Sequence, residues 1–192
     1  MPNPGMQERG RALEEAFFKK QHEQQLAKLR QQEERAQARE ALAAASGITD
    51  DPDLLDRLVA LGIHAETLAA LTLIPLVEVA WADGKMEARE RDAILRGAES
   101  SGIQPGSPSH GLLEIWTHDR PAPELLETWK AYIAALSEEL SADQKWHLEE
   151  KIIGRARAVA EAAGGFLGLG SKVSAEEEAM LAELARAFGT RG

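Results

Sequence analysis

Strand-forming patterns are almost absent from this chain. No run of useful length alternates apolar and polar residues, the pattern that a half-buried strand requires. Valine, isoleucine, threonine and tyrosine are scarce, whereas alanine, leucine, glutamate and arginine dominate the 192 residues. Because the dominant residues all favour helices, the sequence predicts an all-α protein.

The first quarter of the chain is highly charged and has few helix breakers. Residues 8–45 contain no proline and one glycine, and side chains of opposite charge recur three or four positions apart. Each such pair stabilises a helix by about 0.2–0.5 kcal/mol. No heptad of apolar residues is sustained, which disfavours a long coiled coil. We therefore expect residues 1–46 to form a charged, solvated helical arm.

Two short apolar patches interrupt this arm. Leu13 and Phe17 share one face, and Leu26 and Leu29 form the second patch. The end that carries Leu13, Phe17 and Phe18 is a candidate partner-binding surface, because aromatic side chains are enriched in protein interfaces. The alternative interpretation is a solvated arm without a docking role.

The remainder of the chain, residues 47–190, predicts a bundle of about seven helices. The helices expected from capping residues and breakers span about 52–61, 65–81, 87–101, 109–118, 122–139, 142–163 and 175–188. The second of these is the most apolar, so we expect it at the centre of the core, with a kink at Pro75. The last begins with a capping box formed by Ser174 and Glu177.

The charge distribution disfavours nucleic acid as a partner. Net charge is −10, from 22 basic and 32 acidic residues. Residues 1–40 hold eight basic and seven acidic side chains, so the rest of the chain carries −11. An acidic surface repels phosphates, and no basic stripe interleaved with aromatic residues is present.

Other functional classes are excluded by composition. The chain has no cysteine, which rules out disulfides, thiolate metal sites and a cysteine nucleophile. No apolar run approaches the ~20 residues that span a bilayer, and the N-terminus has no pattern of a secretion signal. We expect a soluble, cytoplasmic protein without membrane insertion.

The segment 79–94 joins two of the expected helices through a tight turn. Asp83 is placed to accept backbone N–H groups, and Gly84 supplies a positive φ. Glu87 and Glu90 fall in the first turn of the next helix, where the helix dipole favours carboxylates. Local stabilisation of a turn accounts for each of these residues.

A fainter copy of this turn lies near the C-terminus. Alignment of residues 83–90 with 170–177 keeps a lysine, an apolar residue, an alanine and the final glutamate in place. Two helix–turn–helix halves, at about 65–101 and 143–188, predict an internally pseudo-duplicated bundle.

The Ala82-Asp-Gly phrase, followed seven positions after the aspartate by Glu90, resembles the TerB-like domain of bacterial tellurite-resistance and stress proteins. The resemblance covers roughly residues 65–188 and implies an all-α fold of about seven helices in pseudo-twofold halves. It departs at Gly170-Ser171, where that family often repeats an acidic–glycine pair. Related domains occur beside membrane or chaperone modules, so the implied partners are proteins, including membrane-associated complexes.

A divalent cation is a second candidate ligand, because the TerB-like family is suspected of binding metal through acidic residues. Asp83, Glu87 and Glu90 match the second half of an EF-hand loop, but the first two ligand positions hold valine and tryptophan. That excludes a true EF-hand. A weaker site from these three residues, extended by Glu78, stays open beside the alternative of a capped structural turn.

A tryptophan beside a proline-rich loop is a further candidate partner contact. His110 and His118 flank Trp116 on the expected helix 109–118. An exposed aromatic residue in this position predicts a contact surface for a protein partner.

Two more patterns bear on catalysis. Asp143, His147 and Glu150 share one helical face, which could hold zinc or serve acid–base chemistry. The Glu-x-x-His and His-Glu-x-x-His spacings are both missing, so the pattern favours surface hydrogen bonding. The loop Gly164–Lys172 has the order Ser-Lys instead of the Lys-Ser of a phosphate-binding loop, and no strand precedes it. No serine lies in a nucleophile elbow, so we predict no enzyme.

Three functional hypotheses follow from the sequence. The first is a non-enzymatic stress-type module that acts as a protein-interaction scaffold. The second is a divalent-metal-responsive domain that uses the acidic turn at 83–90. In the third, the arm inhibits a larger ATPase, because residues 9–18 are loosely similar to the start of inhibitor subunits of some bacterial ATP synthases.

Overall fold

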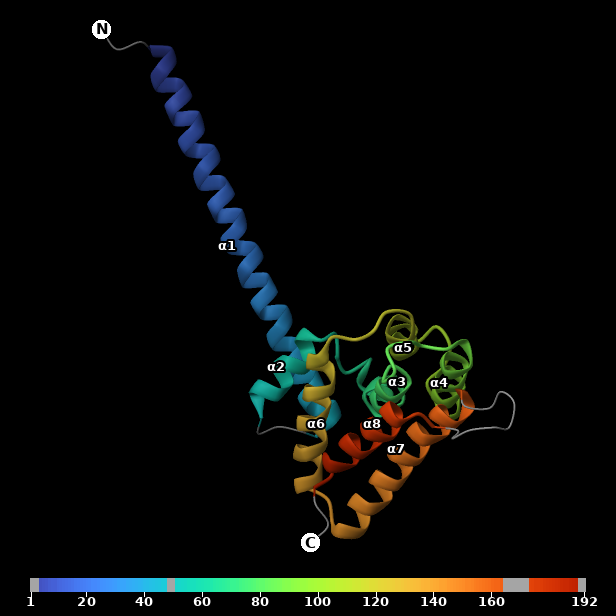
Figure 1. Ribbon diagram of the computed structural model, residues 1–192. Helices are drawn as coiled ribbons and strands as arrows, with labels where there is room; N and C mark the ends of the chain where they lie inside the picture. The colour runs from blue at the N-terminus through green and yellow to red at the C-terminus, as the bar shows by residue number, and fades with distance from the viewer. Residues whose placement is uncertain (1–3, 48–50, 164–172, 190–192) are drawn as a thin grey trace.

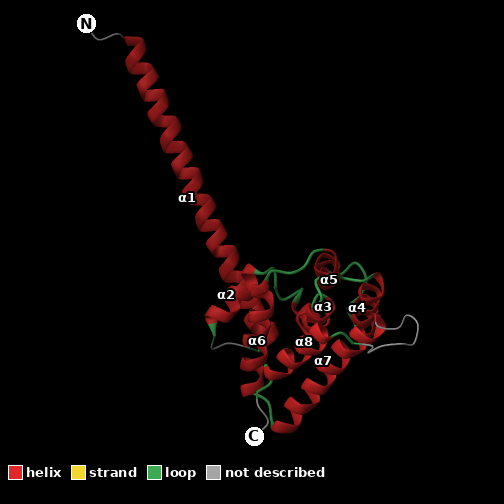
Figure 2. Cartoon of the chain, viewed as in Figure 1, coloured by secondary structure: helices red, strands yellow, loops and turns green. Residues whose placement is uncertain are grey.

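The computed structural model describes residues 4–47, 51–163 and 173–189, with side chains from residue 17 onward except that of Ala163. Within these ranges every regular element is a helix, which confirms the predicted all-α class (Figures 1 and 2). The helices are α1 (Pro4–Ser46), α2 (Pro52–Ala60), the 3-10 helix η1 (Leu68–Leu73), α3 (Ile74–Ala80), α4 (Ala88–Ser100), α5 (Pro108–His118), α6 (Pro123–Glu138), α7 (Ala142–Ala163) and α8 (Ala175–Arg186).

The first helix projects from the bundle as a long arm (Figure 1). Its 43 residues, at a rise of 1.5 Å each, extend for about 65 Å. Side chains from Phe17 to Gln37 are exposed, and burial begins near the last turns of the helix. No helix among the described residues is both long enough and apolar enough to cross a membrane.

The last turns of α1 belong to the bundle. Leu42 has no exposed surface and is part of the hydrophobic core, and α1 contacts both α2 and η1. A boundary between arm and bundle at residue 46, as predicted, would therefore remove a core side chain. Leu42 is flanked by alanines, with Arg39 and Glu40 just before them, and this pattern does not show which helix would cover it.

The most apolar segment forms two elements where one kinked helix was predicted. The 3-10 helix η1 ends at Leu73, and α3 starts at Ile74 with Pro75 in its first turn. Proline lacks the N–H that an α-helix interior needs and clashes with the preceding turn, whereas the first turn needs no such donor. Pro75 therefore starts a helix and does not bend one.

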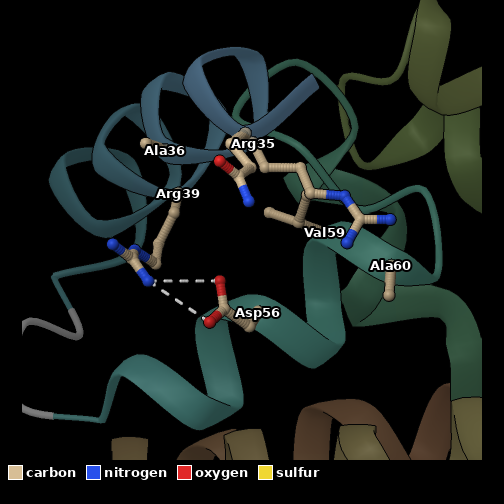
Figure 3. Close-up of a pocket in the computed structure, with 7 residues that line it drawn as sticks. Arg35, Ala36, Arg39, Asp56, Val59 and Ala60 are labelled. Carbon is tan, nitrogen blue, oxygen red and sulfur yellow. Dashed lines mark hydrogen bonds and ion pairs between the residues drawn. The ribbon is translucent and has the colours of Figure 1, made fainter. Parts of the chain in front are cut away.

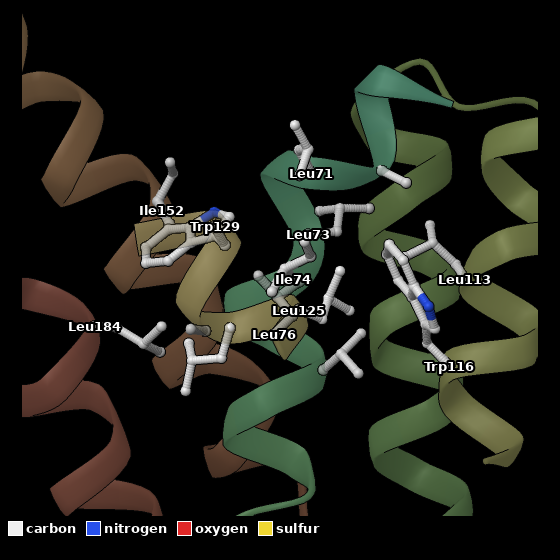
Figure 4. Packing of buried hydrophobic residues seen from close by; sticks show 14 of the residues in the cluster. Leu71, Leu73, Ile74, Leu76, Leu113, Trp116, Leu125, Trp129, Ile152 and Leu184 are labelled. Carbon is white, nitrogen blue, oxygen red and sulfur yellow. The ribbon is translucent and has the colours of Figure 1, made fainter. Parts of the chain in front are cut away.

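Helix α3 lies at the centre of the core, as predicted. All seven of its residues are buried, and it packs against α6, α7 and α8. Figure 4 shows the leucines of η1 and α3 between Trp129 of α6 and Trp116 of α5. Trp129 is fully buried and meets the Phe188 ring edge-on, with ring centroids 6.1 Å apart. Burial of each such side chain stabilises the fold by about 1.5–3 kcal/mol.

The other predicted helices are confirmed to within about two residues at each end. The capping box of α8 is also confirmed: the Glu177 N–H donates to Ser174 Oγ at 3.1 Å, and the Ser174 N–H donates to Glu177 Oε2 at 2.6 Å. The second turn of the predicted duplication, at residues 170–172, lies outside the described residues. The duplication stays a prediction.

Candidate functional site

The arm carries the most exposed aromatic side chains among the described residues. Phe17 is 59% exposed and Phe18 is 66% exposed, and their rings meet edge to face with centroids 6.1 Å apart. Leu13, the third residue predicted for this surface, lies in α1 before the stretch whose side chains are described. Solvent reaches both phenylalanines, and their role in binding stays a prediction.

An apolar stripe continues from Phe18 along the arm. Leu26 and Leu29 are 40% and 55% exposed, and they follow Phe18 by eight and eleven residues. At about 100° per residue, these three side chains fall within roughly 80° of one another around the helix. The arm therefore presents one apolar face that the described part of the chain leaves in water.

A hollow of about 440 Å³ lies between the arm and α2, next to the place where the two helices come together (Figure 3). Across it, Arg39 Nη1 lies 3.2 Å from Oδ2 and 3.4 Å from Oδ1 of Asp56. Both side chains are about half exposed, so the ion pair contributes at most about 1 kcal/mol. The burial of Leu42 is the larger force that orients the arm.

Trp116 does not form an exposed contact, and that prediction is wrong. Its side chain is 6% exposed and lies near Leu113 in the core (Figure 4). Its carbonyl oxygen accepts the indole N–H of Trp81 at 2.8 Å. Helix α5 packs against η1 and α4, which turns Trp116 inward and leaves its neighbour Ile115 57% exposed.

The acidic turn between α3 and α4 is a capped turn. Asp83 Oδ1 accepts the Lys85 N–H at 2.9 Å, and Gly84 has φ +87°, as the sequence predicts. Glu90 is 3% exposed, and its Oε2 accepts the Glu87 N–H at 2.8 Å. Glu90 thus satisfies a donor that the start of α4 would otherwise leave unpaired.

Capping accounts for Asp83 and Glu90 in this turn, and the cation site at Asp83, Glu87 and Glu90 stays a prediction. Within the described residues, no group of three or more His, Cys, Asp or Glu side chains has a geometry that could hold a metal ion. Glu90 Oε2 is directed at the Glu87 N–H, which is the contact of a helix cap. A carboxylate at this position has the same sequence pattern whether it caps the helix or binds a cation.

The two aligned turns share one structural detail. Glu90 is the third residue of α4 and Glu177 the third residue of α8, each is buried, and each accepts the N–H of the residue before its helix. Burial raises the pKa of Glu90 to about 7, against the lowering effect of the Glu87 N–H. The negative charge of Glu177 raises the pKa of Glu90 further.

Glu78 of α3 is another buried carboxyl group. It is 6% exposed, and burial raises its pKa to about 7. The Arg120 and Lys130 cations lower the pKa, whereas Glu183 raises it. Lys130 itself pairs with Glu183 and so is only partly available to Glu78. At neutral pH the bundle therefore holds two glutamates that are partly protonated.

A further apolar hollow opens where α6 ends and α7 begins. We call it the α6–α7 groove; its volume is about 540 Å³, and it is lined by Leu136, Leu140 and Leu148 together with Asp143, Gln144, His147 and Lys151. Trp146, on the same turn of α7, is 46% exposed. The sequence does not indicate this groove, because apolar residues on α6 and α7 look alike whether another helix covers them or not.

The polar residues of α7 near this groove form no catalytic cluster. His147 Nδ1 lies 2.7 Å from the Asp143 carbonyl oxygen, and its ring meets Trp146 edge-on, with centroids 4.7 Å apart. Because a carbonyl only accepts hydrogen bonds, Nδ1 carries the hydrogen. This contact fits the surface hydrogen bonding that the sequence favours for this face over a zinc or acid–base role.

The glycine-rich loop Gly164–Lys172 lies outside the described residues.

Comparison with known proteins finds no family model, no curated protein and no solved structure that matches this chain. Function must therefore be inferred from the residues and their arrangement.

Proposed function

We propose that this chain is a non-enzymatic protein-interaction scaffold, in which a helical bundle holds out a helical arm that binds a protein partner. The observation that carries the proposal is the pair Phe17 and Phe18, more than half exposed on a helix that is anchored at its other end. Aromatic residues concentrate in interfaces, and a large exposed apolar surface marks a binding site.

The way the arm is held supports this role. Side chains between Phe17 and Gln37 are exposed, so the arm does not stabilise the bundle through them. Helices in proteins gain most of their stability from packing of an apolar face. The stripe formed by Phe18, Leu26 and Leu29 supplies such a face, and a partner that covers it would stabilise the arm.

The cellular setting that we propose is a bacterial stress response of the TerB type, in the cytoplasm. Its support is the resemblance of the segment 82–90 to the TerB-like motif, and the acidic balance of the bundle, which favours protein over nucleic-acid partners. In this setting the bundle positions the arm and performs no chemistry.

A photo-crosslinking experiment tests the role of the arm. A photoreactive amino acid replaces Gln21, which is exposed and one turn from Phe17 and Phe18. With the wild-type phenylalanines we expect a covalent adduct between position 21 of the arm and a protein partner. The double variant Phe17→Ser, Phe18→Ser should lose this adduct, because it removes the apolar side chains that contact the partner.

The matched control replaces two exposed polar residues of the same helix, Gln24→Ser and Gln25→Ser. This control should keep the adduct. An adduct of equal yield in the phenylalanine variant and in wild type would show that the arm tip is not the binding element, and the proposal would fail.

A further inference from the structure

The arm tip and the α6–α7 groove are two apolar surfaces that the described part of the chain leaves uncovered. The tip offers Phe17 and Phe18 on a helix, and the groove offers three leucines in a hollow of about 540 Å³. A helix that places its apolar side in a hydrophobic groove is a common mode of recognition. The arm tip and the α6–α7 groove could therefore bind each other in this mode, one as the apolar helix and the other as the apolar groove.

The arm of one chain cannot reach the groove of that chain. In Figure 1 the arm leaves the bundle beside α2 and points away from the turn between α6 and α7, which lies at the opposite end. From Ala36, at the anchored end, to Phe17 the helix continues for about 28 Å in this direction. A contact between tip and groove thus requires two chains.

Charge favours this contact. Residues 9–30 hold six basic and three acidic side chains, and Lys19 and Lys20 directly follow the two phenylalanines. The chain beyond residue 40 carries −11, and Glu138, Glu139 and Asp143 are exposed at the α6–α7 turn, where they outnumber the one cation among the described residues that line the groove, Lys151. Attraction between a basic tip and an acidic bundle speeds the association of two chains. It also favours contact of the tip with a bundle over contact between two bundles, which repel each other.

We propose that the α6–α7 groove binds the arm tip of a second copy of this chain, and that two copies exchange arms reciprocally. A twofold axis that sets the two bundles antiparallel directs each arm toward the α6–α7 turn of the other chain. Such an isologous arrangement uses both apolar surfaces twice and leaves none of them in water. The inference rests on the proposed function, since it names the partner of the arm.

Disulfide cross-linking between two single-cysteine chains tests this arrangement. The protein has no cysteine, so each variant carries one defined thiol. Gln21→Cys places a thiol beside Phe17 and Phe18, and Gln144→Cys places one at the groove; neither change removes an apolar side chain. Oxidation of a mixture of the two full-length variants should give a covalent heterodimer.

The control pairs Gln21→Cys with Glu99→Cys, an exposed position on α4 away from the groove. We expect the groove pair to cross-link about tenfold more than this control, which corresponds to about 1.4 kcal/mol of preference. Equal yields for the two pairs would overturn the proposal.

Sedimentation of the unmodified full-length protein provides an independent measurement. We expect a dimer that dissociates in the variant Phe17→Ser, Phe18→Ser and that weakens as salt screens the charges. A protein that remains monomeric at all concentrations would overturn the arm exchange. The proposed function would then survive only if the Gln21 photo-adduct contains a different protein; loss of both results would reject both proposals.

Discussion

Arg39 Nη1 on the arm lies 3.2 Å from Asp56 Oδ2 on α2, and this ion pair is about half exposed. Leu42, one turn further along the arm, is completely buried. Two of the contacts that attach the arm therefore differ greatly in energy. An exposed ion pair contributes less than about 1 kcal/mol, whereas loss of a buried leucine side chain costs about 2–5 kcal/mol.

The first prediction compares these two contacts. Arg39→Ala should lower the free energy of unfolding by at most about 1 kcal/mol, and Leu42→Ala by about 2–5 kcal/mol. Urea denaturation measures both. Gln31→Ala, at an exposed position of the same helix outside the apolar stripe, is the control and should change the free energy by less than about 0.5 kcal/mol. Equal losses in all three variants would contradict the anchoring role of Leu42.

The second prediction concerns truncation of the arm. Removal of residues 1–30 deletes exposed side chains from Phe17 onward and should leave the bundle's melting temperature nearly unchanged. Removal of residues 1–46 also deletes Leu42 and should lower that temperature by roughly 4–20 °C, because a gap opens in the core. Differential scanning calorimetry of the two shortened chains separates the cases. A normal melting transition without residues 1–46 would place the domain boundary at 46, as the sequence predicts.

The third prediction follows from the raised pKa of Glu78. A glutamate with a folded-state pKa of about 7 and an unfolded-state pKa near 4.5 binds its proton more tightly when folded. It therefore lowers the free energy of unfolding as pH rises from about 4.5 to 7, and the loss is complete above pH 7. Its upper limit is about 3 kcal/mol, at 1.36 kcal/mol for each unit of pKa.

The variant Glu78→Gln should remove this part of the pH dependence and be more stable than wild type at pH 8. Urea denaturation at pH 5 and pH 8 measures the effect. Glu99→Gln, at an exposed position, should keep the wild-type slope. If Glu78→Gln also keeps that slope, burial does not hold the proton on Glu78.

The fourth prediction separates the two roles of Glu90, which is both a buried acid and a cap. Glu90→Ala removes the acceptor of the Glu87 N–H and should cost about 1–2 kcal/mol. Glu90→Gln keeps a side-chain oxygen and removes the charge, so at pH 8 its stability should equal or exceed that of wild type. Thermal unfolding at pH 8 ranks the three proteins. A large loss in the glutamine variant would show that α4 needs the negative charge.

Burial of the tryptophans illustrates what sequence patterns leave open. Trp116 and Trp146 both lie on amphipathic helices, yet the first is 6% exposed and the second 46% exposed. Periodicity identifies the apolar face of a helix but not which part of that face another helix covers. The prediction for Trp116 was wrong for this reason, and the α6–α7 groove had no signal in the sequence.

Local interactions, by contrast, were determined by the sequence itself. The all-α class, the ends of most helices, the turn at Asp83-Gly84 and the cap at Ser174 and Glu177 depend on residues within a few positions of one another. Such contacts form in the same way whatever the rest of the chain does. A pattern of nearby residues is therefore sufficient to predict them.

The tertiary structure decided everything that requires partners distant in sequence. It placed Leu42 of the arm in the core and raised the pKa of Glu78 by burial. Burial and desolvation depend on which helices meet, and that is set by packing of the whole core and not by the order of a few residues.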